Sequence, residues 1–133
     1  MQWKYIKTLQ DENLIKEFEE MLSYNLNRGY VDCIKQNNGG RPSNRVFYTE
    51  QGTERVVKSF LSFNKEDRET VWKILDWNKD ILEDKYIPFA IDNFGNIICF
   101  FKQDDSVVFI EHETGIVEKI ASDFESFISG LTE

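Results

Sequence analysis

Residues 86–120 read YIPFAIDNFGNIICFFKQDDSVVFIEHETGIVEKI, and in them apolar runs alternate with short polar segments rich in Asp, Asn and Gly. The segment between the runs 87–91 and 97–101 has the Asn and Gly residues typical of tight turns between strands. The unbroken apolar run 97–101 indicates a central strand that is covered on both faces. Residues 106–111 and 116–120 repeat the pattern after further polar turns. The stretch therefore predicts an antiparallel meander.

Segments with helical periodicity precede the meander. Within residues 11–22, apolar side chains recur at the spacing of one helix face and glutamates fill the other face. A second helix is expected at 29–37, ended by a left-handed cap in Asn38-Gly39-Gly40 and by Pro42. A third helix is expected to begin near Asn64, which we predict to be its N-cap.

A closing helix follows the meander. Ser122 and Glu125 have the spacing of a capping box, in which the two side chains bond to free backbone N–H groups of the first turn. Phe124, Phe127 and Leu131 then recur on one face, which is expected to pack on the sheet.

Two further strands are predicted before the third helix. Residues 45–49 and 55–63 are rich in β-branched and aromatic residues and are separated by Gly52. No repeat, low-complexity tract or linker divides the chain, so residues 1–133 are expected to form one domain. The predicted fold class is α+β, a mostly antiparallel mixed sheet flanked by N-terminal, middle and C-terminal helices.

Charge is distributed unevenly along the chain, whose formal net charge is −8. Residues 1–77 contain 12 basic and 12 acidic side chains, whereas residues 78–133 contain 4 basic and 12 acidic ones. An acidic field repels phosphate groups, so nucleic acid and membranes are not expected as direct partners. Such a field attracts a basic protein and speeds the encounter with it. Acidity that only keeps the protein in solution is the alternative.

The cysteines and the start of the chain bear on the compartment. No secretory signal peptide and no apolar run long enough to span a membrane is recognisable. Cys33 and Cys99 are far apart and belong to no C-x-x-C motif. We therefore expect a cytoplasmic protein with reduced, buried thiols.

Residues able to carry catalysis or to hold a metal are few. His112 is the single histidine and lacks the second histidine of the H-E-x-x-H motif. No Gly-x-Ser-x-Gly motif occurs, and neither cysteine has a histidine close in sequence. Residues 92–96 resemble the start of a calcium loop without its later bidentate glutamate, so a hairpin turn explains them. We predict no enzymatic activity, no cofactor and no metal site.

Several motifs occur in an order typical of one family. They are Asn38-Gly39-Gly40 with Pro42, the run 87–92 leading into Gly95-Asn96, the apolar strand 97–101, the segment 107–113 and the closing segment 121–127. Over nearly the whole chain this order resembles the SUKH superfamily, which unites fungal cell-wall regulators and bacterial immunity proteins. The resemblance implies a mixed sheet flanked by helices and no catalytic activity.

The resemblance also implies a partner. Bacterial members typically bind and neutralise a cognate polymorphic toxin, often a nuclease domain, so we expect an immunity protein that occludes a basic toxin domain. A non-catalytic regulatory or scaffold module is the alternative, and we expect a monomer or a weak dimer. Acids in exposed turns and aromatic anchors are the side chains that suit such an interface. The candidates are Glu83, Asp84, Asp92, Asp104, Asp105, Glu111, Glu113, Trp77 and Tyr86.

The turn at Asp104 and Asp105 is the most informative of these sites, because it lies between two apolar runs. Both side chains are expected to be exposed, so that charge reversal there leaves stability almost unchanged.

Overall fold

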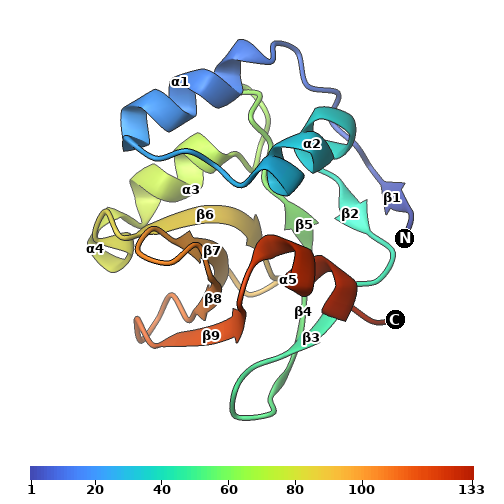
Figure 1. Cartoon of the computed structure of the whole chain (residues 1–133), viewed down its shortest axis with the longest axis vertical. Helices are drawn as coiled ribbons and strands as arrows, with labels where there is room; N and C mark the ends of the chain where they lie inside the picture. The colour runs from blue at the N-terminus through green and yellow to red at the C-terminus, as the bar shows by residue number, and fades with distance from the viewer.

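The predicted meander forms most of a five-stranded sheet in the computed structural model, which describes residues 1–133 (Figure 1). Every neighbouring pair of strands in this sheet is antiparallel. With helices before, between and after the strands, the fold is α+β, which confirms the predicted class. In spatial order the strands are β5 (Ser59–Phe60), β6 (Tyr86–Ile91), β7 (Ile97–Phe101), β8 (Val107–Ile110) and β9 (Val117–Ala121).

Strand β7 is buried on both faces, as its apolar run predicts. Alternate residues of a strand point to opposite faces of the sheet. Ile98 and Phe100 therefore belong to the main core, whereas Ile97 and Cys99 belong to a smaller cluster that includes Leu82. All five side chains of β7 are apolar, and only Phe101 at its end is partly exposed.

Five helices surround the sheet, and none of them has the length and apolar character needed to cross a membrane. In Figure 1, α5 lies in front of the sheet, and α1 lies beside α3. The contact between α1 and α3 is an edge-to-face pair of Phe18 and Trp72, with ring centroids 5.0 Å apart. The helices are α1 (Asn13–Leu22), α2 (Arg28–Asn37), α3 (Val71–Trp77), α4 (Lys79–Leu82) and α5 (Phe124–Gly130).

Aromatic rings join α2, the sheet and α5. The ring of Tyr30 in α2 lies 5.1 Å from Phe100 and 5.5 Å from both Phe89 and Phe124, measured between centroids. Phe89 stacks on Phe100 at 4.4 Å. The hydroxyl of Tyr30 is buried among these rings without a hydrogen-bond partner.

Two small sheets complete the fold. Strand β1 (Trp3–Lys4) pairs with β2 (Arg41–Pro42), and β3 (Val46–Tyr48) pairs with β4 (Glu54–Val56). Figure 1 shows the β3–β4 hairpin projecting from the rest of the molecule. The single strand predicted over 55–63 is thus divided, because the chain leaves the hairpin after β4 and joins the main sheet as β5.

The helix caps differ from the sequence-based expectation. Asp123, not Ser122, caps α5, because its carboxylate accepts the backbone N–H of Ser126 at 2.7 Å. Thr70, not Asn64, caps α3, and its hydroxyl accepts the N–H of Lys73. In both cases the helix begins later in the chain than the motif indicates.

Asn38 and Asn64 instead hold the N-terminal segment in place. The side chain of Asn38 donates to the carbonyl of Lys7 at 2.7 Å and accepts the N–H of Phe63 at 2.9 Å. Asn64 donates to the carbonyl of Thr8 at 2.9 Å. The left-handed residue after α2 is Gly39, with a φ of 67°, whereas Asn38 has a φ of −50°.

The packing of α5 on the sheet predicts a large cost for Phe127→Ala. Phe127 is 3% exposed and contacts the rings of Phe47 and Phe89. Removing it should lower the free energy of unfolding by about 3–5 kcal/mol in a urea titration. The control is Phe94→Ala, which removes a ring that is 76% exposed and should change the free energy by less than about 0.5 kcal/mol. Equal effects would show that α5 does not pack as described.

The buried hydroxyl of Tyr30 predicts that a second variant does not lose stability. Because this group has no partner, Tyr30→Phe should leave the free energy of unfolding unchanged or raise it by about 1 kcal/mol. Thermal and urea unfolding both measure the change. A clear loss of stability would mean that the hydroxyl has a hydrogen-bond partner in solution, such as a buried water.

Candidate functional site

Turns at one end of the sheet bring four of the predicted acids together. Tyr86, at the start of β6, pairs with Phe101, at the end of β7, so both strands have a terminus here. The turn before β6 and the turn after β7 are therefore neighbours, and Figure 1 shows the second turn close to α4. We call this region the acidic end, and its residues are Glu83, Asp84, Asp104 and Asp105.

Lys102 ties the two turns to α1. Its ammonium group donates to the carboxylate of Asp84 at 2.9 Å and to the carbonyl of Leu22 at 2.9 Å. Its backbone N–H donates to the carbonyl of Lys85 at 2.9 Å. The ammonium group of Lys102 thus helps to hold the backbone of the acidic end together.

Tyr24, just after α1, adds a second tie by donating its hydroxyl proton to the carboxylate of Asp105. Burial raises the pKa of Tyr24 well above its ordinary value, and the bond to Asp105 and the negative charges of Asp105 and Asp104 raise it further. Tyr24 therefore stays neutral, and its hydroxyl remains a donor.

Asp104 and Asp105 are exposed, as expected, but both carboxylates also shape the turn. Asp104 accepts the hydroxyl of Ser106 at 2.6 Å and its N–H at 3.0 Å. These two bonds lower the pKa of Asp104, which keeps it ionised. The expectation that charge reversal here leaves stability untouched therefore needs correction: lysines at both positions would remove the bonds to Ser106 and Tyr24.

The backbone of the acidic end is strained. Glu83, Asp84 and Asp105 have φ values of 52°, 58° and 61°, in the left-handed region that side-chain-bearing residues seldom adopt. Strain of this kind persists where the surrounding structure enforces it, and it gathers at functional sites. Here it directs three carboxylates outward from two adjacent turns.

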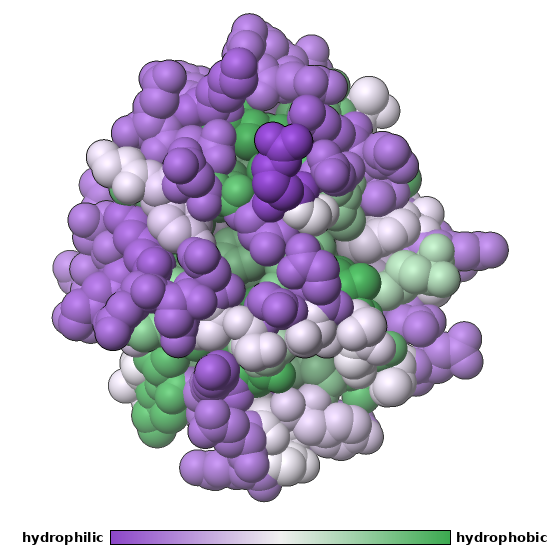
Figure 2. Space-filling view, viewed as in Figure 1, coloured by the Kyte–Doolittle hydropathy of each residue, from purple (hydrophilic) through white to green (hydrophobic).

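An apolar groove lies beside the acidic turns. It has a volume of about 460 Å³, and its lining combines the apolar side chains of Met21, Leu22, Leu75 and Leu82 with the charged ones of Lys79, Glu83 and Asp84. The face of the molecule shown in Figure 2 is mostly hydrophilic, with smaller hydrophobic areas between. Apolar side chains next to exposed acids form the kind of surface on which proteins dock.

The two predicted aromatic anchors differ in exposure. Trp77 ends α3 just before α4 and is 68% exposed, so its ring is available to a partner. Tyr86 is half-buried, and its ring stacks on that of Phe101 with centroids 5.1 Å apart. Tyr86 therefore offers a partner less of its ring than Trp77 does.

The remaining predicted acids lie at the opposite end of the sheet. Glu111 and Glu113 follow β8, whose last residue, Ile110, pairs with the first residue of β7. The length of β7 separates them from the acidic end by roughly 15 Å, at about 3.3 Å per residue. Asp92 is only 3% exposed, and its carboxylate accepts the N–H groups of Phe94 and Asn96. Its charge holds the hairpin turn, so we leave Asp92 out of the candidate surface.

Sequence reasoning missed the contribution of the segment that ends α1. Met21 belongs to the apolar stripe of α1, yet it is exposed and lines the groove. Glu20 is exposed next to it and makes no ion pair within the chain. Helical periodicity assigns Met21 to the apolar face of α1 and Glu20 to the polar face. It cannot show which part of the molecule lies beside them.

His112, Cys33 and Cys99 make contacts within the fold and are not grouped with one another as a site. Nδ1 of His112 lies 3.2 Å from Oδ1 of Asn96, and the imidazole packs against Gly95. Burial raises the pKa of both thiols, Cys33 and Cys99, which are unpaired. No three His, Cys, Asp or Glu side chains are grouped as metal ligands.

A known protein family matches most of the chain. The family model described as SUKH_6, SMI1-KNR4 cell-wall, matches residues 12–128. The matched region runs from the start of α1 into α5 and contains the whole five-stranded sheet and the acidic end. No curated protein matches the chain.

The tie between α1 and the β7–β8 turn predicts an effect of Tyr24→Phe. Losing its bond to Asp105 should lower the free energy of unfolding by about 1 kcal/mol and speed amide exchange in residues 102–106. Tyr48→Phe is the control, because its exposed hydroxyl lies 3.3 Å from Glu54 in the projecting hairpin. Indistinguishable exchange in the turn of the two variants would contradict the role of Tyr24.

Proposed function

The chain belongs to the SMI1-KNR4 cell-wall family, and from this we propose that it is an immunity protein whose acidic end binds and occludes a basic toxin domain. The family match covers nearly the whole chain and accords with the resemblance to the SUKH superfamily. Binding without catalysis is the activity that this membership suggests. We choose the acidic end as the binding surface because exposed acids lie there beside an apolar groove.

The carboxylates of the acidic end are suited to bind a partner whose own surface normally binds phosphate groups. A nuclease domain presents lysine and arginine side chains to nucleic acid, and those cations would pair equally with Glu83, Asp104 and Asp105. Charge complementarity of this kind mainly accelerates encounter and selects the partner. In this mechanism the immunity protein covers the cationic surface of the toxin and excludes its substrate.

Apolar contacts would then set the lifetime of the complex. Interface energy is concentrated in a few central, desolvated side chains, and tryptophan is among the most frequent. Trp77 and the groove side chain Met21 are exposed in the free protein, and burying them removes apolar surface from water. Association and dissociation should therefore respond to different residues.

The charge contribution is tested by the paired variant Glu83→Asn with Asp105→Asn. Asparagine tolerates positive φ and keeps an acceptor oxygen, so the turns should persist while two charges are lost. Where a neighbouring gene encodes a toxin domain, association with that domain should slow by about three- to tenfold at low salt, and by less at high salt.

The matched control removes two charges from the opposite end, as Glu111→Gln with Glu113→Gln. Because the net charge changes equally, only the position of the lost charges differs. Equal slowing by both pairs would show that the acidity acts through total charge and that the acidic end is not the interface.

Trp77→Ala tests the apolar contribution. It should speed dissociation about tenfold or more, if Trp77 is a central anchor, with the association rate nearly unchanged. Phe94→Ala, which removes an exposed ring near the opposite end of the sheet, is the control.

Growth rescue of cells that express the toxin distinguishes neutralisation from simple binding. A complex that forms without rescue would favour a scaffold role.

A further inference from the structure

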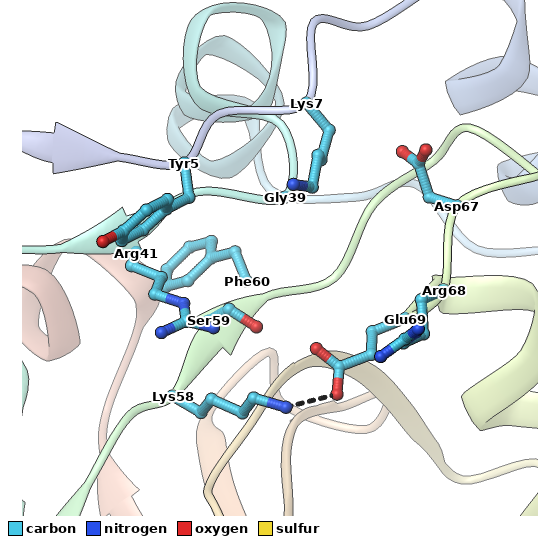
Figure 3. Close-up of a pocket in the computed structure, with 10 residues that line it drawn as sticks. All are labelled: Tyr5, Lys7, Gly39, Arg41, Lys58, Ser59, Phe60, Asp67, Arg68 and Glu69. Atoms are coloured by element: carbon cyan, nitrogen blue, oxygen red, sulfur yellow. Dashed lines mark hydrogen bonds and ion pairs between the residues drawn. The ribbon is translucent and has the colours of Figure 1, made fainter.

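A cleft on the N-terminal half of the chain has the opposite charge (Figure 3). It has a volume of about 310 Å³ and lies between the segment after β1, strands β2 and β5, and the loop before α3. Ser59 in its wall pairs with Ile91, at the end of β6 away from Tyr86. The cleft is therefore separate from the acidic end.

The acids of the cleft are already engaged. Glu69 pairs with Lys58 at 2.7 Å, the ion pair drawn in Figure 3. Asp67 accepts the hydroxyl of Ser62 at 2.6 Å and the amide of Asn64 at 3.2 Å.

Three cations of the cleft, by contrast, have no ion-pair partner in the chain: Lys7, Arg41 and Arg68. They are exposed, and they come from three separate segments. A protein with a net charge of −8 thus keeps a local surplus of positive charge around one hollow.

Tyr5 forms one wall and is held in a strained conformation. Its φ is 56°, a value that is unfavourable for a bulky residue, although its side chain is 66% exposed and contributes little to the core. The guanidinium carbon of Arg41 lies 5.0 Å from the centroid of its ring. Figure 3 shows Arg41 beneath Tyr5 and beside Ser59. Stacking fixes the plane of the guanidinium and leaves its N–H groups to bind a planar anion.

Gly39 and Lys7 pack closely together in the cleft. A Cβ at Gly39 would lie 2.9 Å from Cγ of Lys7, and Gly39 has a positive φ, so only glycine fits there without moving Lys7. The bond from Asn38 to the carbonyl of Lys7 fixes the same backbone. A site whose groups are held before binding loses less entropy when the ligand arrives.

We propose that this cleft binds carboxylate side chains of an acidic peptide segment on a partner protein. A guanidinium matches a carboxylate in a two-point, charge-assisted hydrogen bond. Figure 3 shows Lys7, Arg41 and Arg68 at different places around the cleft. Separated cations suit an extended chain with more than one carboxylate better than a compact phosphate. The acidic remainder of the protein repels long polyanions such as nucleic acid. The inference concerns a different surface and does not rest on the function of the acidic end.

The test is a titration of the ¹⁵N-labelled full chain with an acetylated and amidated hexaglutamate peptide, followed by amide signals. Signals of Tyr5, Gly39, Arg41 and Arg68 should shift together. Arg41→Gln should weaken binding about tenfold, as expected for a lost charge-assisted pair. The matched control is Arg28→Gln, since Arg28 is exposed, lies on α2 and makes no ion pair. It should leave the affinity unchanged.

Tyr5→Gly separates binding from folding. Glycine adopts the positive φ without strain, so the unfolding midpoint should not fall, whereas peptide binding should weaken. Three results would overturn the proposal: no shift of the cleft signals up to millimolar peptide, equal weakening by Arg28→Gln and Arg41→Gln, or inorganic phosphate binding in the cleft as tightly as the peptide. The last result would assign the cleft to a free phosphate ligand.

Discussion

The stacked rings of Phe89 and Phe100, 4.4 Å apart between centroids, are the contact around which the molecule is assembled. They join the two central strands β6 and β7, and they meet Tyr30 from α2 and Phe124 from α5. One helix that precedes the sheet in sequence and one that follows it are thereby fixed to the same point. The positions of α2 and α5 on the sheet therefore depend on this cluster.

A second, polar constraint places the N-terminal segment. Asn38 is buried and links the carbonyl of Lys7 to the N–H of Phe63, so three distant parts of the chain meet at one side chain. Buried amides of this kind are costly unless their bonds are made, which makes the arrangement specific. The same bond fixes the backbone of Lys7, which lies close to Gly39 in the cationic cleft.

The two surfaces proposed for binding have opposite charge and lie near opposite ends of the sheet. At the acidic end, strained turns present carboxylates beside an apolar groove. At the cleft, Asp67 and Glu69 make internal bonds, whereas three of the four cations make no ion pair. This separation suits a protein whose function is recognition, since each surface selects a different chemistry in a partner. Membership of the SMI1-KNR4 cell-wall family agrees with such a function.

The sequence by itself determined the strands of the meander, the helical segments and the α+β class, because these depend on periodicities of side chains that are close in the chain. It also located the acid excess after residue 77. Only the tertiary structure decided that Asp92 is buried in its turn and that Glu111 lies at the other end of the sheet from Asp104. The structure also shows that Asp123, one residue after the predicted Ser122, caps α5. Which charges meet depends on strand register and on long-range hydrogen bonds, and neither is encoded in local spacing.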